Sequence, residues 1–141
     1  HRQINLSIEH DLPIVIHTRN AMQETIDVVS EYKGKARGIF HCFGGSGDDA
    51  QRIIELGYYL GIGGVVTYKN SGLASVLEQI DLKHIVLETD APYLTPVPFR
   101  GKRNECSYLS LVQEKIAAIK NISLDEVASI TSENALKVFA L

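Results

Sequence analysis

The chain has 141 residues and a mass of 15.6 kDa, which allows one compact domain with a hydrophobic core and is too short for two ordinary domains. Apolar residues make up 45% of the sequence and charged residues 22%, which excludes the disordered and fibrous classes. Fourteen basic and seventeen acidic side chains give a net charge of −3, so no overall positive field would attract a polyanion. Any contact with nucleic acid therefore has to be local.

No apolar run approaches the roughly 20 residues that span a bilayer, so we expect no membrane contact. Cys42 and Cys106 form neither a CxxC pair nor a disulfide framework, which predicts a reducing compartment, the cytoplasm. Because no repeat, linker or low-complexity tract interrupts the sequence, we expect residues 1–141 to form a single domain.

Strand-like and helix-like patterns alternate along the chain. The first residues predict a helix that stops before Pro13, since proline cannot continue it. Short runs rich in β-branched residues then alternate with segments whose apolar residues recur at helical spacing. Ser46 and Asp49 form a capping-box-like helix start, and Ser123 and Glu126 form a second. The expected strands are 12–17, 38–41, 58–63 and 84–88, and the expected helices are 20–34, 46–57, 73–80, 109–119 and a last one from 123.

Four strand–helix units, with strands apolar on both faces, predict a parallel sheet covered by helices, which is the α/β class. The strands follow one another at the short intervals of a TIM-like (β/α)8 barrel, whose eight units need about 250 residues. The chain would supply about half of such a barrel. A loop from 90 to about 107 carries Pro92, Pro96 and Pro98, and loops of this length are usually functional.

Polar side chains stand where the expected strands end. His17 and His41 end the first two strands, and Glu88 and Asp90 follow the fourth. Function gathers beyond the carboxyl ends of parallel strands, and imidazole nitrogen and carboxylate oxygen are ligands that zinc and manganese accept. These residues therefore suggest a divalent-cation site, although each histidine could instead make a single hydrogen bond at its strand end. Spacing alone leaves both interpretations open.

Several strings in the chain are specific enough to indicate a family. They are PIVIHTR (13–19), FHCFGGS (40–46), LGYYLGIGG (56–64), LETDAPYLTP (87–96) and RGKRNE (100–105). Together they resemble the TatD family of metal-dependent deoxyribonucleases over nearly the whole chain. The resemblance implies a (β/α)8 barrel related to the amidohydrolases, with two or three cations that hydrolyse phosphodiesters. It also implies that His17 and His41 are ligands of one divalent cation and Asp90 of a second, with Mg, Mn or Zn as candidates.

Two features of the family pattern are absent from the chain. The family has a His-x-His pair on its opening strand and a glutamate that bridges the cations, and neither occurs here. Residues 1–141 correspond to the last four strands and helices of the barrel, its C-terminal half. We therefore expect little or no activity from the isolated chain, and either self-association or contact with the missing half. Smaller departures are Gly45, where serine is usual, and Cys106, where proline is usual.

Candidate roles follow for the strand-end and loop residues. Asp90 could accept a proton from the attacking water, and Glu88, on the same side of its strand, could orient a metal ligand or simply pair with a basic neighbour. Guanidinium groups bind phosphate in a bidentate fork, and tyrosines can stack on bases. The predicted catalytic residues are Asp90 and Glu88, and the predicted DNA-binding residues are Arg19, Tyr93, Arg100, Lys102 and Arg103.

Two competing functions remain on the sequence alone. An amidohydrolase-like barrel could cleave a small ester or amide, although the RGKRNE loop is less suited to such a substrate. A non-catalytic scaffold could keep the fold without the chemistry. The absent ligands favour the scaffold for the isolated chain, while the joint presence of His17, His41 and Asp90 favours an enzyme for the whole protein.

Overall fold

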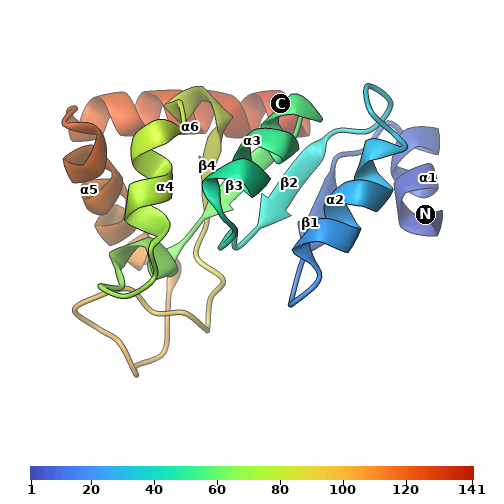
Figure 1. Cartoon of the computed structure of the whole chain (residues 1–141). Coiled ribbons are helices and arrows are strands. Elements are labelled where there is room, and N and C mark those ends of the chain that lie inside the picture. Colours follow the sequence, from blue (N-terminus) through green and yellow to red (C-terminus); the bar gives the residue numbers. More distant parts are fainter.

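The computed structural model describes residues 1–141, and at its centre lies a parallel four-stranded sheet (Figure 1). The strands lie in chain order, and each pairs in parallel with the next, so a helical crossover connects every pair. This arrangement confirms the α/β class. The strands are β1 (Ile14–His17), β2 (Gly38–His41), β3 (Tyr59–Ile62) and β4 (Ile85–Leu87).

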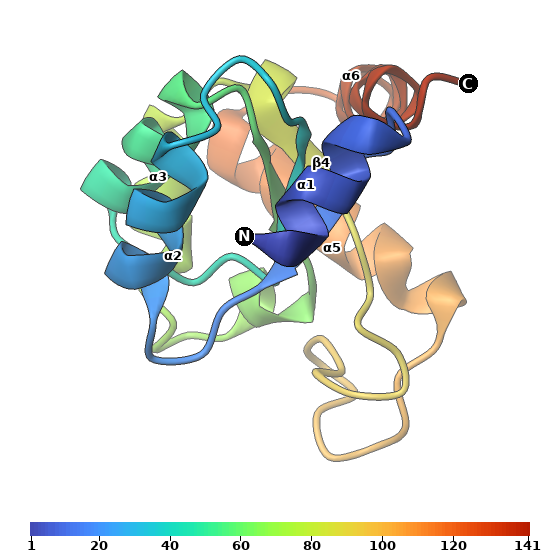
Figure 2. The same ribbon diagram turned by 90° about the vertical axis from the view of Figure 1, so that its right-hand side faces the viewer.

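Six α-helices and three short 3-10 helices surround the sheet. Helices α2, α3, α4 and α5 contact one another in chain order and cover one face of the sheet, and Figure 2 shows α2 and α3 side by side there. None of the helices is long and apolar enough to cross a bilayer. The α-helices are α1 (Arg2–Glu9), α2 (Met22–Ser30), α3 (Gly47–Glu55), α4 (Leu73–Gln79), α5 (Leu109–Lys120) and α6 (Leu124–Phe139), and the 3-10 helices are η1 (Gly64–Thr67), η2 (Leu82–His84) and η3 (Cys106–Tyr108).

Local sequence signals account for most element boundaries. The capping box at the start of α3 is confirmed, because the Asp49 N–H donates to the Ser46 hydroxyl at 3.1 Å and the Ser46 N–H donates to the Asp49 carboxylate at 2.9 Å. Proline has no N–H to donate, and β1 begins after Pro13 rather than at residue 12. The expectation that the fourth strand starts at His84 is wrong. His84 ends η2, whose first turn is capped by Asp81 accepting the Lys83 N–H at 3.0 Å.

One large hydrophobic core lies between the sheet and its helices. Its central side chains are almost fully inaccessible to solvent, and Phe40 packs edge-on against Tyr58 with ring centroids 5.6 Å apart. This packing fixes which side of each strand faces the helices, and therefore which side chains face the other way. Core side chains from the strands are Phe40, Leu60, Ile62 and Ile85.

Helix α6 crosses the amino ends of the strands, opposite the strand ends that carry the candidate site (Figure 1). Buried Asn134 donates to the carbonyl oxygens of Leu82 and Ile85 at 2.9 and 2.8 Å. Val138 packs against Ile39 and Val86 on the face of the sheet away from the main core. This helix therefore closes one end of the sheet and leaves the carboxyl ends free.

The β1 edge is the least covered part of the sheet. Its residues alternate between half-buried and exposed, and Val15 and Leu12 are 55% and 60% exposed. A groove of about 800 Å³ runs between β1, α1 and α2, and half of the residues that line it are hydrophobic. The expectation that every strand is apolar and covered on both faces is therefore wrong for β1, because no element packs on its outer side chains.

Candidate metal centre

His17 and His41 lie directly opposite each other at the carboxyl ends of β1 and β2. Their ring centroids are 6.1 Å apart, and the planes are tilted by 36°. Parallel pairing in register brings the last residues of both strands to the same edge of the sheet. The two histidines therefore face a common region, as the sequence predicts.

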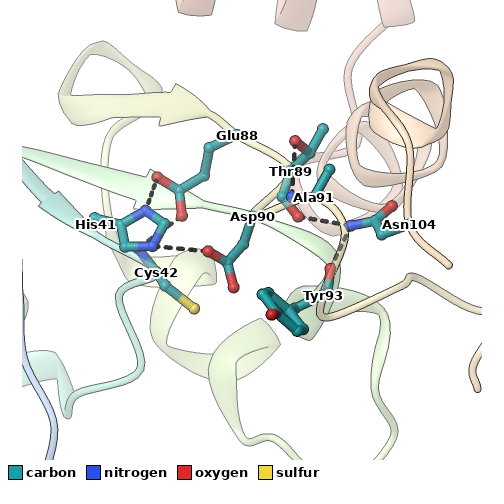
Figure 3. A network of polar contacts seen from close by, with 8 residues as sticks. All are labelled: His41, Cys42, Glu88, Thr89, Asp90, Ala91, Tyr93 and Asn104. Atoms are coloured by element: carbon teal, nitrogen blue, oxygen red, sulfur yellow. Dashed lines mark hydrogen bonds and ion pairs between the residues drawn. The ribbon is translucent and has the colours of Figure 1, made fainter.

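His41 is held by two carboxylates. Its Nδ1 lies 2.9 Å from Glu88 Oε2, and its Nε2 lies 3.1 Å from Asp90 Oδ1 (Figure 3). All three side chains are mostly buried. The interpretation that a histidine makes only one hydrogen bond at its strand end does not hold for His41. Glu88 forms no ion pair with lysine or arginine, and its basic partner is His41 itself.

Asp90 follows β4 in a tight turn. Its backbone φ is 55°, a left-handed conformation that few residues other than glycine adopt. The Tyr93 N–H donates to the Asp90 carbonyl at 2.8 Å, and the Ala91 N–H donates to the Thr89 hydroxyl at 3.3 Å. These bonds turn the chain directly after the strand and leave the Asp90 carboxylate facing His41 (Figure 3).

Asn104 ties together the long loop that follows Asp90. It is 2% exposed, and its side-chain amide donates to the carbonyl oxygens of Thr89 and Tyr93 at 2.7 Å each (Figure 3). Its side-chain oxygen accepts the Glu105 N–H at 2.9 Å, so the buried amide is satisfied on both sides. Sequence reasoning missed this residue, because an asparagine in a loop rich in proline and basic residues gives no separate signal.

The loop also forms a shallow recess of about 380 Å³ beside the site. Tyr93, Arg100 and Lys102 line it, and the Arg100 guanidinium lies over the Tyr68 ring at 4.1 Å from the centroid. Neither Arg100 nor Lys102 is in an ion pair, which leaves their charges available to an anion. Arg19 and Arg103 are exposed and do not line this recess. The structure thus brings together three of the five predicted DNA-binding residues.

Cys42, which follows His41, is partly buried. Burial, together with the negative charges of Glu88 and Asp90, raises the pKa of the Cys42 thiol to about 11. The thiol is therefore protonated at neutral pH, and such a thiol is a poor nucleophile. This environment favours a packing role for Cys42.

The donor chemistry of the site fits a divalent cation. Two neighbouring ligands that each lie about 2.1 Å from one octahedral ion, at an angle near 90°, are separated by roughly 3 Å. The 3.1 Å between His41 Nε2 and Asp90 Oδ1 matches that separation, and His17 is the neighbouring donor in register. No group of three or more His, Cys, Asp or Glu side chains comes close enough to hold an ion by itself. His17, His41 and Asp90 are donor types that bind a divalent cation, but too few of them come together to complete its ligand set.

Imidazole and carboxylate groups at the carboxyl ends of a parallel α/β sheet are an arrangement suited to a metal-dependent enzyme. The sequence model described as "TatD related DNase" matches residues 1–140. The chain belongs to this family, and the resemblance inferred from its motifs is confirmed.

Relatives and solved structures agree with this assignment. The chain is 44% identical over 141 residues to "Uncharacterized metal-dependent hydrolase YabD" of Bacillus subtilis, covering 99% of the chain and 55% of that protein. It is 33% identical to "Uncharacterized metal-dependent hydrolase YcfH" of Escherichia coli, covering 96% of the chain and 52% of that protein. The crystal structure of the Escherichia coli TatD homolog YJJV superposes with a TM-score of 0.92 at 28% identity, over 99% of the chain and 54% of YJJV. The chain thus spans about half the length of the relatives it matches.

Proposed function

We propose that the whole protein is a metal-dependent deoxyribonuclease in which these four βα units form half of a (β/α)8 barrel. The observation that carries the proposal is the 3.1 Å approach of His41 Nε2 to Asp90 Oδ1 at the carboxyl ends of the strands. Membership of the TatD related DNase family supports it. Two free thiols and no disulfide are consistent with a cytoplasmic protein.

His17, His41 and Asp90 are the residues of this chain that would hold divalent cations. Bound there, such cations would act as Lewis acids that polarise a phosphoryl oxygen and lower the pKa of water. Asp90 would accept the proton of the attacking water, because its second carboxylate oxygen is not bonded to His41. Mg, Mn and Zn all accept imidazole or carboxylate ligands, and the geometry does not favour one of them.

The recess beside Asp90 would hold the DNA backbone. Arg100 and Lys102 supply positive charge at its rim, and Tyr93 is 70% exposed next to them, where a base could stack on its ring. Arg19 and Arg103 lie outside the recess and would contact phosphates further along the strand. This local patch would bind a polyanion despite the net charge of −3.

The isolated chain should show little or no hydrolysis. Metal affinity follows the number and geometry of ligands, and no group of three donors is assembled here. The exposed β1 edge and its apolar groove support self-association of the chain, or contact with the remainder of a longer protein. Sedimentation tests this point, and a stable monomer at micromolar concentration would contradict it.

A chimera with YabD tests the activity. Residues 1–141 would replace the aligned segment of YabD, which is 44% identical. Both proteins would be stripped of metal and assayed with Mg, Mn or Zn on DNA and on small ester and amide substrates. We expect the chimera to hydrolyse DNA only with added metal and to lose activity with EDTA. Asp90→Asn should reduce the rate by about 100-fold or more, since it removes the proton acceptor and a ligand.

The controls separate the competing functions. Unmodified YabD shows whether the scaffold supports the reaction, and Glu114→Gln in the chimera removes an exposed carboxylate elsewhere. Turnover of small esters or amides without DNA cleavage would overturn the nuclease assignment in favour of an amidohydrolase-like enzyme. If the folded chimera neither binds metal nor hydrolyses any of these substrates while YabD is active, the result would favour a non-catalytic scaffold.

A further inference from the structure

The Glu88 carboxylate uses both of its oxygens on the end of β2. Oε2 lies 2.9 Å from His41 Nδ1 (Figure 3), and Oε1 accepts the Cys42 N–H at 2.7 Å. The side chain is 17% exposed. One carboxylate therefore holds both the imidazole ring and the backbone next to it.

Gly61 on β3 provides the space in which this carboxylate lies. A Cβ atom at Gly61 would be 2.3 Å from Glu88 Oε2 and 2.9 Å from Glu88 Cδ, closer than real contacts allow. The Gly61 carbonyl also accepts the Phe43 N–H at 2.9 Å. A glycine inside a strand weakens the strand and often marks a close approach. Here the atoms that approach are those of the Glu88 carboxylate.

The backbone between these two anchors is strained. Cys42 has a φ of 49°, in the left-handed region that residues with a Cβ rarely occupy. Such conformations cost free energy and persist only where surrounding contacts enforce them. The bonds from the Cys42 N–H to Glu88 and from the Phe43 N–H to Gly61 enforce the turn directly after His41.

We propose that Glu88, seated in the space left by Gly61, is the positioning residue that fixes His41 as a metal ligand. Holding Nδ1 leaves Nε2 to face Asp90, 3.1 Å away. In proteins, a carboxylate on the far nitrogen of a ligating histidine fixes its tautomer and orientation, and its loss typically costs 10- to 100-fold in metal affinity, roughly. The inference rests on the proposed metal centre, and it adds Glu88 and Gly61, which donate nothing to the ion.

Zinc affinity of the intact 141-residue chain, measured by isothermal titration calorimetry, tests the proposal. Glu88→Gln keeps the shape of the side chain but offers only one acceptor oxygen for two donors. Gly61→Ala leaves Glu88 in place and forces its carboxylate to move. We expect each variant to weaken zinc binding by about 10- to 100-fold. The double variant should lose little more than the worse single variant, because both changes break the same contact.

Two matched controls separate this effect from general damage. Gly47→Ala adds a methyl group where no atom lies within 4 Å, and Glu114→Gln removes an exposed carboxylate. Both should bind zinc as the unaltered chain does. Urea unfolding of every variant checks that it is folded, and Glu88→Gln keeps the test decisive if Gly61→Ala does not fold.

Nuclear magnetic resonance of the zinc-bound chain supplies a readout that a purely structural role of Glu88 would not change. The proton on His41 Nδ1 should exchange slowly in the unaltered chain and fast in Glu88→Gln. Unchanged affinity and exchange in Glu88→Gln, with binding lost in Asp90→Asn, would overturn the role of Glu88 and leave the metal centre standing. If neither His41→Ala nor Asp90→Asn changes zinc binding, or if the folded chimera with YabD binds no zinc, the proposed centre fails and the inference fails with it.

Discussion

His17 and His41 occupy the same register position on neighbouring strands, but their surroundings differ. His41 lies inside the sheet and contacts two carboxylates that follow β4. His17 is exposed, has no hydrogen-bond partner, and ends the strand whose outer edge is open. His41 is held in place because the neighbouring strands bring hydrogen-bond partners to it, whereas His17 at the edge of the sheet has none. The comparison between the inner strands and the β1 edge extends to the apolar residues, because Leu60 is inaccessible while Val15 is 55% exposed.

The largest expected effect compares a residue of an inner strand, Leu60, with a residue of the β1 edge, Val15. Leu60→Ala should lower the free energy of unfolding by about 2 to 5 kcal/mol, since it leaves a cavity in the main core. Val15→Ala should change it by only about 0.5 kcal/mol at concentrations too low for self-association, because the side chain is then largely in water. Urea unfolding of both variants measures the difference. Equal losses would mean that the β1 edge is covered in solution.

Asn104→Ala should come next, lowering the free energy of unfolding by about 2 to 3 kcal/mol, because the carbonyl oxygens of Thr89 and Tyr93 lose the buried amide that donates to both. Asn70→Ala, at an exposed loop position, should have almost no effect and serves as the control. Amide hydrogen exchange should show faster exchange around residues 89–105 in the first variant. Unchanged exchange there would contradict the view that Asn104 holds this loop.

His41→Ala and His17→Ala compare the two histidines themselves. Removing His41 takes one hydrogen-bond partner from each of two mostly buried carboxylates and should lower the free energy of unfolding by about 1 to 2 kcal/mol in the metal-free chain. Removing His17 should cost no more than about 0.5 kcal/mol. Thermal and urea unfolding both measure these values. A larger loss for His17 than for His41 would reverse the comparison.

The smallest expected effect is a gain in stability at Tyr58. This residue is 2% exposed, and its hydroxyl has no hydrogen-bond partner, unlike the carboxylates around His41. Burial also raises the pKa of Tyr58. Tyr58→Phe keeps the ring against Phe40 and should raise the free energy of unfolding by about 0.5 to 1 kcal/mol. Tyr93→Phe, at an exposed ring, should leave it unchanged, and a loss of stability in Tyr58→Phe would show an unrecognised partner for the hydroxyl.

The sequence predicts the order and type of the elements well, because periodicity and capping act locally. The Ser46–Asp49 box and the strand 38–41 appear where expected. The strand boundaries differ at Pro13 and His84, where backbone hydrogen bonding in the turn before each strand decides the start. The exposure of β1 depends on what covers it, which no local pattern records.

The sequence predicts the residues of the candidate site but not the contacts that hold them in place. Positions at or just after the strand ends identify His17, His41, Glu88 and Asp90 as candidates, because the carboxyl ends of parallel strands meet at one edge of the sheet. The space at Gly61 and the bonds of Asn104 depend on side-chain packing between segments far apart in sequence. The glycine in the middle of LGYYLGIGG is the one signal that could have indicated the first of them.

The most direct test of the proposed site is the effect of Mn²⁺ on the magnetic resonance spectrum of the isotope-labelled chain. Mn²⁺ broadens signals near its binding point even when it binds weakly. We expect signals of His41 and Asp90 to broaden first, followed by His17, and excess Zn²⁺ to reverse the effect. Broadening confined to other acidic residues, such as Asp48 on α3, with His41 and Asp90 unaffected, would contradict the account.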